Sequence, residues 1–186
     1  MRKWITLFSQ TGSEIANVAR RLDRQPDMIV TNKPFDSEDI DPDLQDVVYM
    51  PGRPTTQDYH DILKDHSDAL ITMHGWLRII PDEICKQYEI LNLHPGLITR
   101  YPELKGKDPQ WRVFDMLNLP TRVGCVLHRA IAEVDSGEVL MERSSHNHYP
   151  NGDVLSRHLH WMASDMWVDY LSEFTDIVDN TAQDDQ

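Results

Sequence analysis

Two side chains capable of proton transfer and oxyanion stabilisation lie two residues apart, at the end of a short apolar run. Asn92 and His94 occur in Ile-Leu-Asn-Leu-His-Pro-Gly, where Pro95 and Gly96 end the run. Because side chains alternate along a strand, residues 92 and 94 project from the same face. A carboxamide beside an imidazole can donate hydrogen bonds to an oxyanion and move a proton.

Such a pair needs a carboxylate that orients the imidazole or accepts a proton. Asp135 is the best candidate, because an apolar segment beginning at Ile131 runs through it into a turn at Gly137. A histidine at the end of a strand also has a structural interpretation, as a packed side chain with satisfied hydrogen bonds. The residues alone leave both interpretations open.

The elements that must position these residues alternate along the chain. Apolar runs predict strands at 4–8, 28–31, 47–50, 69–73, 90–93, 122–128 and 139–145, and helical patterns lie between them and after residue 153. This alternation predicts an α/β fold with a mostly parallel, twisted, Rossmann-like sheet and helices on both faces. Such sheets bind ligands at the carboxyl ends of their strands, where Asn92 and His94 are expected.

Two loops at that edge have both a binding and a structural interpretation. The turn Gln10-Thr11-Gly12-Ser13 precedes a helix, so its backbone N–H groups could face an anion, or it could simply connect strand and helix. It matches neither the Walker P-loop nor Gly-x-Gly-x-x-Gly. The apolar loop Trp76-Leu77-Arg78-Ile79-Ile80 could form a wall for a flat aromatic ligand or could close the core.

Composition narrows the classes of function. The 186 residues predict one domain over 1–178, followed by a polar, acidic, disordered tail over 179–186. A net charge of −13 disfavours an extended nucleic-acid surface or an anionic membrane surface. No signal peptide or membrane span is expected, and Cys85 and Cys125 suggest reduced core thiols, so the predicted location is the cytoplasm. No metal site is expected, because His158 and His160 face different sides of a helix.

Four motifs in order resemble the folate-dependent formyltransferase family. They are the turn at 9–13, the loop at 75–80, Asn92-Leu93-His94-Pro95-Gly96, and Gly124–His128 leading to Glu133–Gly137. The resemblance extends from about residue 4 to residue 171. It implies the formyltransferase fold and an enzyme that uses N10-formyltetrahydrofolate as formyl donor.

The resemblance also implies roles for individual residues. Asn92, His94 and Asp135 correspond to the catalytic Asn, His and Asp of the family. The folate pocket corresponds to Trp76, Leu77, Arg78, Ile79, Ile80, Ile131, Ala132, Glu133 and Val134, and the acceptor site to Gln10, Thr11, Gly12, Ser13, Pro95 and Gly96.

The acceptor is expected to be a small amine, phosphorylated or linked to a sugar or nucleotide. Glycinamide ribonucleotide is the alternative, although Gln10 and Thr11 replace family glycine and asparagine positions, and His160–Ala163 offers no carboxylate. Lys105 and Lys107 could contact an anionic part of the acceptor, or could be solvated. A non-catalytic folate-binding protein is the second hypothesis, but it predicts the loss of a catalytic residue. The oligomeric state, monomer or homodimer, is left open.

Overall fold

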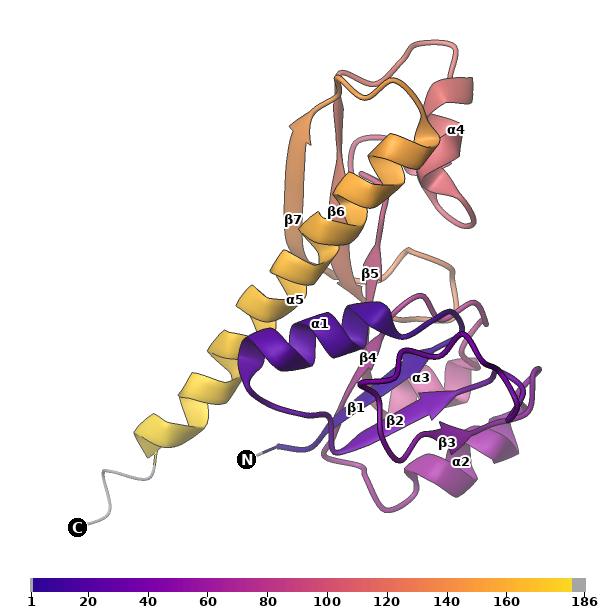
Figure 1. The fold of residues 1–186 in the computed structure, drawn as a ribbon, viewed down its shortest axis with the longest axis vertical. Coiled ribbons are helices and arrows are strands. Elements are labelled where there is room, and N and C mark those ends of the chain that lie inside the picture. The colour runs from indigo at the N-terminus through magenta and orange to yellow at the C-terminus, as the bar shows by residue number, and fades with distance from the viewer. Residues whose placement is uncertain (1, 182–186) are drawn as a thin grey trace.

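The computed structural model describes residues 2–181, with side chains through residue 173. Seven strands form one sheet in the order β3-β2-β1-β4-β5-β6-β7 (Figure 1). They are β1 (Trp4–Phe8), β2 (Met28–Thr31), β3 (Val48–Tyr49), β4 (Leu70–Met73), β5 (Glu89–His94), β6 (Arg122–Arg129) and β7 (Val139–His146). Pairing is parallel from β3 to β5 and antiparallel from β5 to β7. The expected mostly parallel α/β sheet is confirmed.

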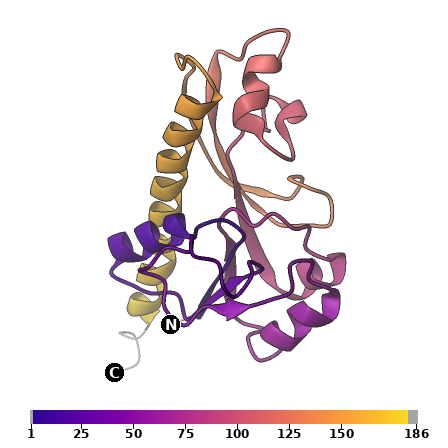
Figure 2. The ribbon, with the colours of Figure 1, turned by 45° about the vertical axis from the view of Figure 1, so that its right-hand side comes forward.

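Helices cover both faces of this sheet (Figures 1 and 2). They are α1 (Ser13–Leu22), α2 (Thr56–Leu63), α3 (Asp82–Gln87), α4 (Pro109–Asp115) and α5 (Gly152–Thr181), with a short 3₁₀ turn at Pro102–Leu104. The long α5 lies against α1 and α4. The backbone of α5 continues through Thr181, so residues 179–181 of the expected tail are helical, and residues 182–186 lie outside the described part.

The sheet separates two apolar cores. On one face Trp4, Leu91 and Leu93 pack with the buried side of α5, which includes Leu159 and Trp167. On the other face, strand residues pack against α2 and α3, namely Ile5, Leu7, Ile71, Ile90, Tyr59, Leu63 and Ile84. All four residues of β4 are buried, as expected of a parallel strand covered on both sides.

The strand order brings the loops that follow β1, β4 and β5 together at the carboxyl ends of these strands. The sheet continues from β1 through β2 to β3 on one side and from β4 to β5 on the other, so the chain reverses direction across the sheet between β1 and β4. In open α/β sheets this reversal leaves a crevice at the carboxyl ends of the strands. No helix in the described part of the chain is long and apolar enough to cross a bilayer.

Candidate active site

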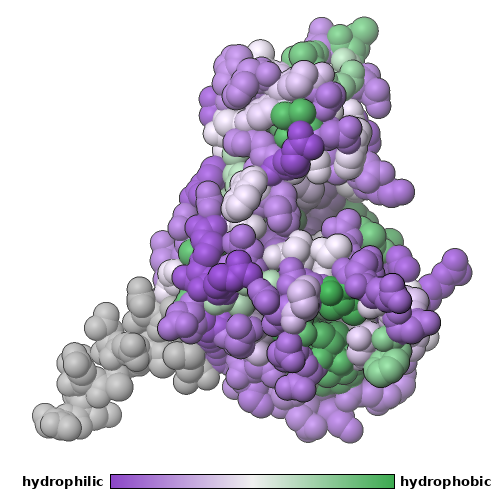
Figure 3. All heavy atoms as spheres, in the orientation of Figure 1, coloured by the Kyte–Doolittle hydropathy of each residue, from purple (hydrophilic) through white to green (hydrophobic). Residues whose placement is uncertain are grey.

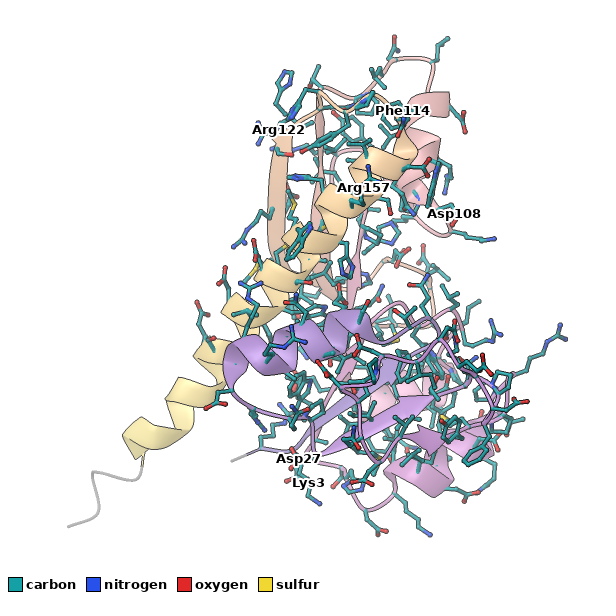
Figure 4. All side chains as sticks on the ribbon, viewed as in Figure 1. Lys3, Asp27, Asp108, Phe114, Arg122 and Arg157 are labelled. Atoms are coloured by element: carbon teal, nitrogen blue, oxygen red, sulfur yellow. The ribbon has the colours of Figure 1, made fainter. Side chains whose placement is uncertain are left out.

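A cavity of about 910 Å³ opens at the carboxyl ends of β1, β4 and β5. Its walls are the loop after β1, the loop after β4, the end of β5, the start of α4 and one side of α5. Figure 3 shows the surface hollowed between α4 and the loops below it. Asp108, which precedes α4, lies at the rim of this cavity (Figure 4).

Asn92, His94 and Asp135 meet in this cavity. The Oδ2 atom of Asp135 lies 3.1 Å from Nδ1 of His94, and its Oδ1 accepts a hydrogen bond of 3.3 Å from Nδ2 of Asn92. Asn92 and His94 share a face of β5, as the two-residue period predicts. The sequence-based grouping of a carboxamide, an imidazole and a carboxylate therefore matches one contiguous cluster.

Both ring nitrogens of His94 face oxygen acceptors. Nδ1 faces Asp135, and Nε2 lies 2.9 Å from the carbonyl oxygen of Leu104. A doubly protonated imidazolium satisfies both contacts, because each nitrogen then donates a hydrogen bond. His94 is 4 % exposed, and its ring fits because Gly96 has no side chain: a Cβ there would lie 2.8 Å from Nε2.

Asp135 is held as a carboxylate by its surroundings. Burial opposes its ionisation, but hydrogen bonds from His128 and His94, the charge of His94 and the Gly106 amide outweigh burial and hold the pKa of Asp135 well below its usual range. The Gly106 N–H donates to Oδ2 at 2.8 Å. Asp135 has φ of 50°, a left-handed conformation that Asp tolerates better than most residues.

His128 is a fourth member of this cluster, and sequence reasoning missed it. The antiparallel pairing of β5 and β6 places it opposite Asn92. Its Nε2 lies 3.3 Å from both Asn92 Nδ2 and Asp135 Oδ1, while its Nδ1 lies 2.9 Å from the carbonyl oxygen of Arg129. Its place at the end of a buried apolar strand, just before the Asp135 turn, was the available clue.

The residues expected around folate divide into three groups. Leu77, Arg78, Ile79, Ile131 and Val134 line the cavity, and the four apolar side chains among them are 43–70 % exposed. Trp76 and Ile80 also line it but are mostly buried, and the Trp76 indole donates to the Tyr59 hydroxyl at 3.1 Å. Among the described residues, Ala132 and Glu133 are not part of the lining.

Most of the residues expected at the acceptor site also line the cavity. Gln10, Thr11, Gly12, Ser13 and Pro95 line the cavity, whereas Gly96 lies beneath His94 and does not. Gly12 has φ of 77°, and a Cβ there would lie 2.4 Å from Leu44, so the turn requires glycine.

The two lysines of the following loop have different surroundings. Lys105 donates to the Ser136 hydroxyl at 2.7 Å and so joins its loop to the Asp135 turn. Lys107 lines the cavity, and its side chain is 85 % exposed. Glu14, His74 and His160 also line the cavity, and the sequence had suggested none of them as site residues.

Comparison with known proteins assigns the family. The family described as formyl transferase matches residues 4–148. The chain belongs to the formyl transferase family. Members of this family use N10-formyltetrahydrofolate as the formyl donor.

Relatives within the formyl transferase family include a phosphoribosylglycinamide formyltransferase of Dictyostelium discoideum, 31% identical over 90 residues. The match covers 44% of this chain and 43% of that protein, so it spans less than half of the relative.

Solved formyl transferases share the fold. A phosphoribosylglycinamide formyltransferase from Campylobacter jejuni has a TM-score of 0.78 at 18% identity, over 94% of this chain and 98% of that one. A sugar N-formyltransferase from Shewanella has a TM-score of 0.70 at 19% identity, over 92% and 69%. At these identities the likeness concerns the fold.

Proposed function

We propose that this protein transfers a formyl group from N10-formyltetrahydrofolate to the primary amine of a small acceptor. The observation that carries the proposal is the buried cluster of Asn92, His94 and Asp135 in the cavity of a formyl transferase fold. A neutral amine attacks the formyl carbon and forms a C–N bond, which produces a tetrahedral oxyanion. The bond from that carbon to folate N10 then breaks.

Asn92 and His94 stabilise the oxyanion that forms in this reaction. The carboxamide of Asn92 lines the cavity, and protonated His94 can donate from Nε2 when the oxyanion replaces the Leu104 carbonyl. One preorganised donor of this kind is worth about 3 kcal/mol in the transition state. The imidazolium adds charge to its hydrogen bond.

Asp135 takes part in the proton transfers of this reaction. Its carboxylate stabilises the His94 imidazolium through the 3.1 Å contact. The attacking nitrogen loses one proton, and folate N10 gains one as it leaves. Asp135 relays this proton directly or through a water molecule, and its low pKa keeps the carboxylate ionised beside His94.

Part of the cavity is lined by apolar side chains, which suit the formyl donor. Leu77, Ile79, Ile131 and Val134 leave apolar surface open to the cavity. A flat heteroaromatic ring buries such surface favourably, at about 25 cal/mol per Å². These residues would hold the pterin end of N10-formyltetrahydrofolate, with its formyl group toward Asn92 and His94.

Glycinamide ribonucleotide is the acceptor that the comparisons favour. The curated relatives are named phosphoribosylglycinamide formyltransferases, which supports this acceptor over the other sugar- or nucleotide-linked amines expected from the sequence. Because a sugar N-formyltransferase from Shewanella shares the fold, an amino sugar is the second candidate acceptor.

Release of tetrahydrofolate from N10-formyltetrahydrofolate, followed spectroscopically, tests the proposal. Glycinamide ribonucleotide, amino-sugar nucleotides and a control without acceptor are compared. Release that depends on glycinamide ribonucleotide supports transfer to that amine. Release that depends on an amino sugar would identify the amino sugar as the acceptor instead. Release without any amine points to hydrolysis, and folate binding without release supports the non-catalytic alternative.

A further inference from the structure

The loop that precedes α4, residues 103–108, supplies a backbone partner to two members of the cluster. The Leu104 carbonyl oxygen lies 2.9 Å from Nε2 of His94. The Gly106 N–H donates to Oδ2 of Asp135 at 2.8 Å. His94 and Asp135 therefore each depend on the backbone of this loop for one of their polar contacts.

The other side of the loop faces Arg112, which lies on α4. Nη1 of Arg112 donates to the carbonyl oxygen of Lys105 at 2.8 Å and to that of Lys107 at 3.4 Å, and Nη2 donates to the carbonyl oxygen of Glu103. The two residues between these three face the cluster instead. Backbone groups of the loop thus alternate between the guanidinium on one side and the cluster on the other.

A guanidinium suits this contact because of its geometry. It carries five N–H donors in a planar fork, whereas the ammonium of a lysine carries its donors on one nitrogen. Within the described part of the chain, the hydrogen bonds of the Arg112 side chain all go to this loop. Arg112 is half-buried and is not among the described residues that line the cavity, so its influence on the site passes through the loop.

The conformation of the loop needs such support. Gly106 has φ of 87° and Asp108 has φ of 54°, so both residues are left-handed. A residue with a side chain keeps this conformation only where surrounding contacts fix it. Arg112 binds the carbonyls on either side of Gly106, and so it fixes the turn at the residue whose amide meets Asp135.

A side chain of the same loop extends this support to the turn that carries Asp135. Lys105 donates to the hydroxyl of Ser136 at 2.7 Å. Arg112 holds the carbonyl of that same lysine. It is therefore linked to Asp135 by two routes, the Lys105 side chain and the Gly106 amide.

We propose that Arg112 is a positioning residue for formyl transfer, because it fixes the loop whose backbone orients His94 and Asp135. This inference rests on the proposed function and deepens it. It gives a role in the reaction to a residue outside the cavity lining. The guanidinium acts through backbone groups of residues 103–108 and makes no contact with the reacting atoms.

Arg112→Gln tests the proposal by separating kcat from KM. We expect kcat to fall about tenfold, because small displacements of catalytic groups are costly. The KM for N10-formyltetrahydrofolate should change less than about twofold, because Arg112 does not line the cavity. Arg122→Gln is the matched control: Arg122 is also half-buried and bonds to the hydroxyl and carbonyl oxygens of Ser144, away from the cavity. Equal kcat values in the two variants, or a raised KM at unchanged kcat, overturn the proposal.

The contacts of His94 can be followed without turnover, which separates this proposal from the proposed function. Long-range 1H–15N correlation spectra of histidine-labelled protein report on each ring nitrogen, and the signals missing from His94→Ala identify this ring. We expect the Nε2 shift of His94 to change in Arg112→Gln and to stay the same in Arg122→Gln. An unchanged shift in Arg112→Gln overturns the positioning role even if formyl transfer occurs. A changed shift supports that role even if no amine is formylated.

A second variant keeps the test decisive if the first one folds poorly. Arg112→Lys keeps the charge and the aliphatic chain, but one nitrogen cannot serve three carbonyls in place of the fork. We therefore expect kcat to fall several-fold in this variant as well. If Arg112→Gln unfolds at a lower temperature than Arg122→Gln, Arg112→Lys decides the question. Wild-type kcat in Arg112→Lys overturns the proposal.

Discussion

Nδ1 of His94 and Oδ2 of Asp135 lie 3.1 Å apart, and the two side chains are only 5% and 7% exposed. A charged pair shielded from water interacts far more strongly than the same pair at a surface. The remaining ring nitrogen of His94 lies within hydrogen-bond distance of a backbone carbonyl, so the ring is held in one orientation. This arrangement holds the imidazole and the carboxylate in place before substrate arrives.

His94→Ala tests the role of that imidazole. We expect kcat to fall by about 10² to 10³, because an oxyanion donor is lost, while the dissociation constant for folate stays nearly unchanged. Steady-state kinetics and equilibrium folate binding provide the two readouts. His146→Ala, at an exposed histidine at the end of β7, is the matched control and should retain wild-type turnover. Wild-type turnover in His94→Ala itself would place the site elsewhere.

Gly96→Ala tests the fit of the His94 ring. The added Cβ would lie 2.8 Å from Nε2 of His94, so the ring must shift and its contact with the Leu104 carbonyl is disturbed. We expect kcat to drop at least tenfold, because small displacements of catalytic groups are costly. Gly52→Ala is the control, since its Cβ would find its nearest neighbour at 3.9 Å. Equal kcat values for the two variants would contradict this account.

Ile79→Asp tests the apolar end of the cavity. Ile79 is 70 % exposed, so the substitution should leave the fold intact while placing a charge where folate is expected to bind. Loss of one buried apolar side chain contact is worth about 1.5 kcal/mol or more, so folate affinity should fall at least tenfold. Leu117→Asp, at a 99 % exposed leucine, serves as control. An unchanged folate affinity in Ile79→Asp would show that folate binds elsewhere.

Asp135→Asn tests how the cluster contributes to stability at different pH values. The folded protein lowers the pKa of Asp135, so the ionised carboxylate stabilises the fold. This contribution is present above the ordinary pKa of about 4 and is lost as pH falls below it. We expect Asp135→Asn to lower the free energy of unfolding by about 2 kcal/mol at pH 7.

Urea unfolding between pH 3 and pH 7 measures that difference. The gap between wild type and Asp135→Asn should narrow as pH falls below about 4. Asp46→Asn is a close control, because Asp46 has φ of 52° but is exposed. A gap that is independent of pH would show that Asp135 does not stabilise the fold through its charge.

Local patterns in the sequence predict the sheet and much of the cluster. The two-residue period of a strand is enough to place Asn92 and His94 on one face, and the apolar segment before Gly137 indicates the turn that carries Asp135. These features depend on neighbours in the chain. The expected α/β fold and the family resemblance follow from the same short patterns.

Other parts of the site depend on contacts between distant segments. His128 faces Asn92 because β6 pairs antiparallel with β5 in one register, which no local pattern specifies. The Leu104 carbonyl and Gly106 amide are backbone groups and leave no residue-type pattern. In the sequence, Glu14 is an ordinary acidic residue in the first turn of a helix, and only the fold brings it into contact with His74.

A chain of hydrogen bonds runs from Trp4 through Thr72 and His74 to Glu14 and so joins the core to the wall of the cavity. Trp4 and Thr72 are buried in the core, and neither lines the cavity. Substitutions at these two positions are expected to shift His74 and Glu14 at the cavity wall as well as to lower stability. A change deep in the core can therefore alter the wall of the cavity without any substitution among the residues that line it.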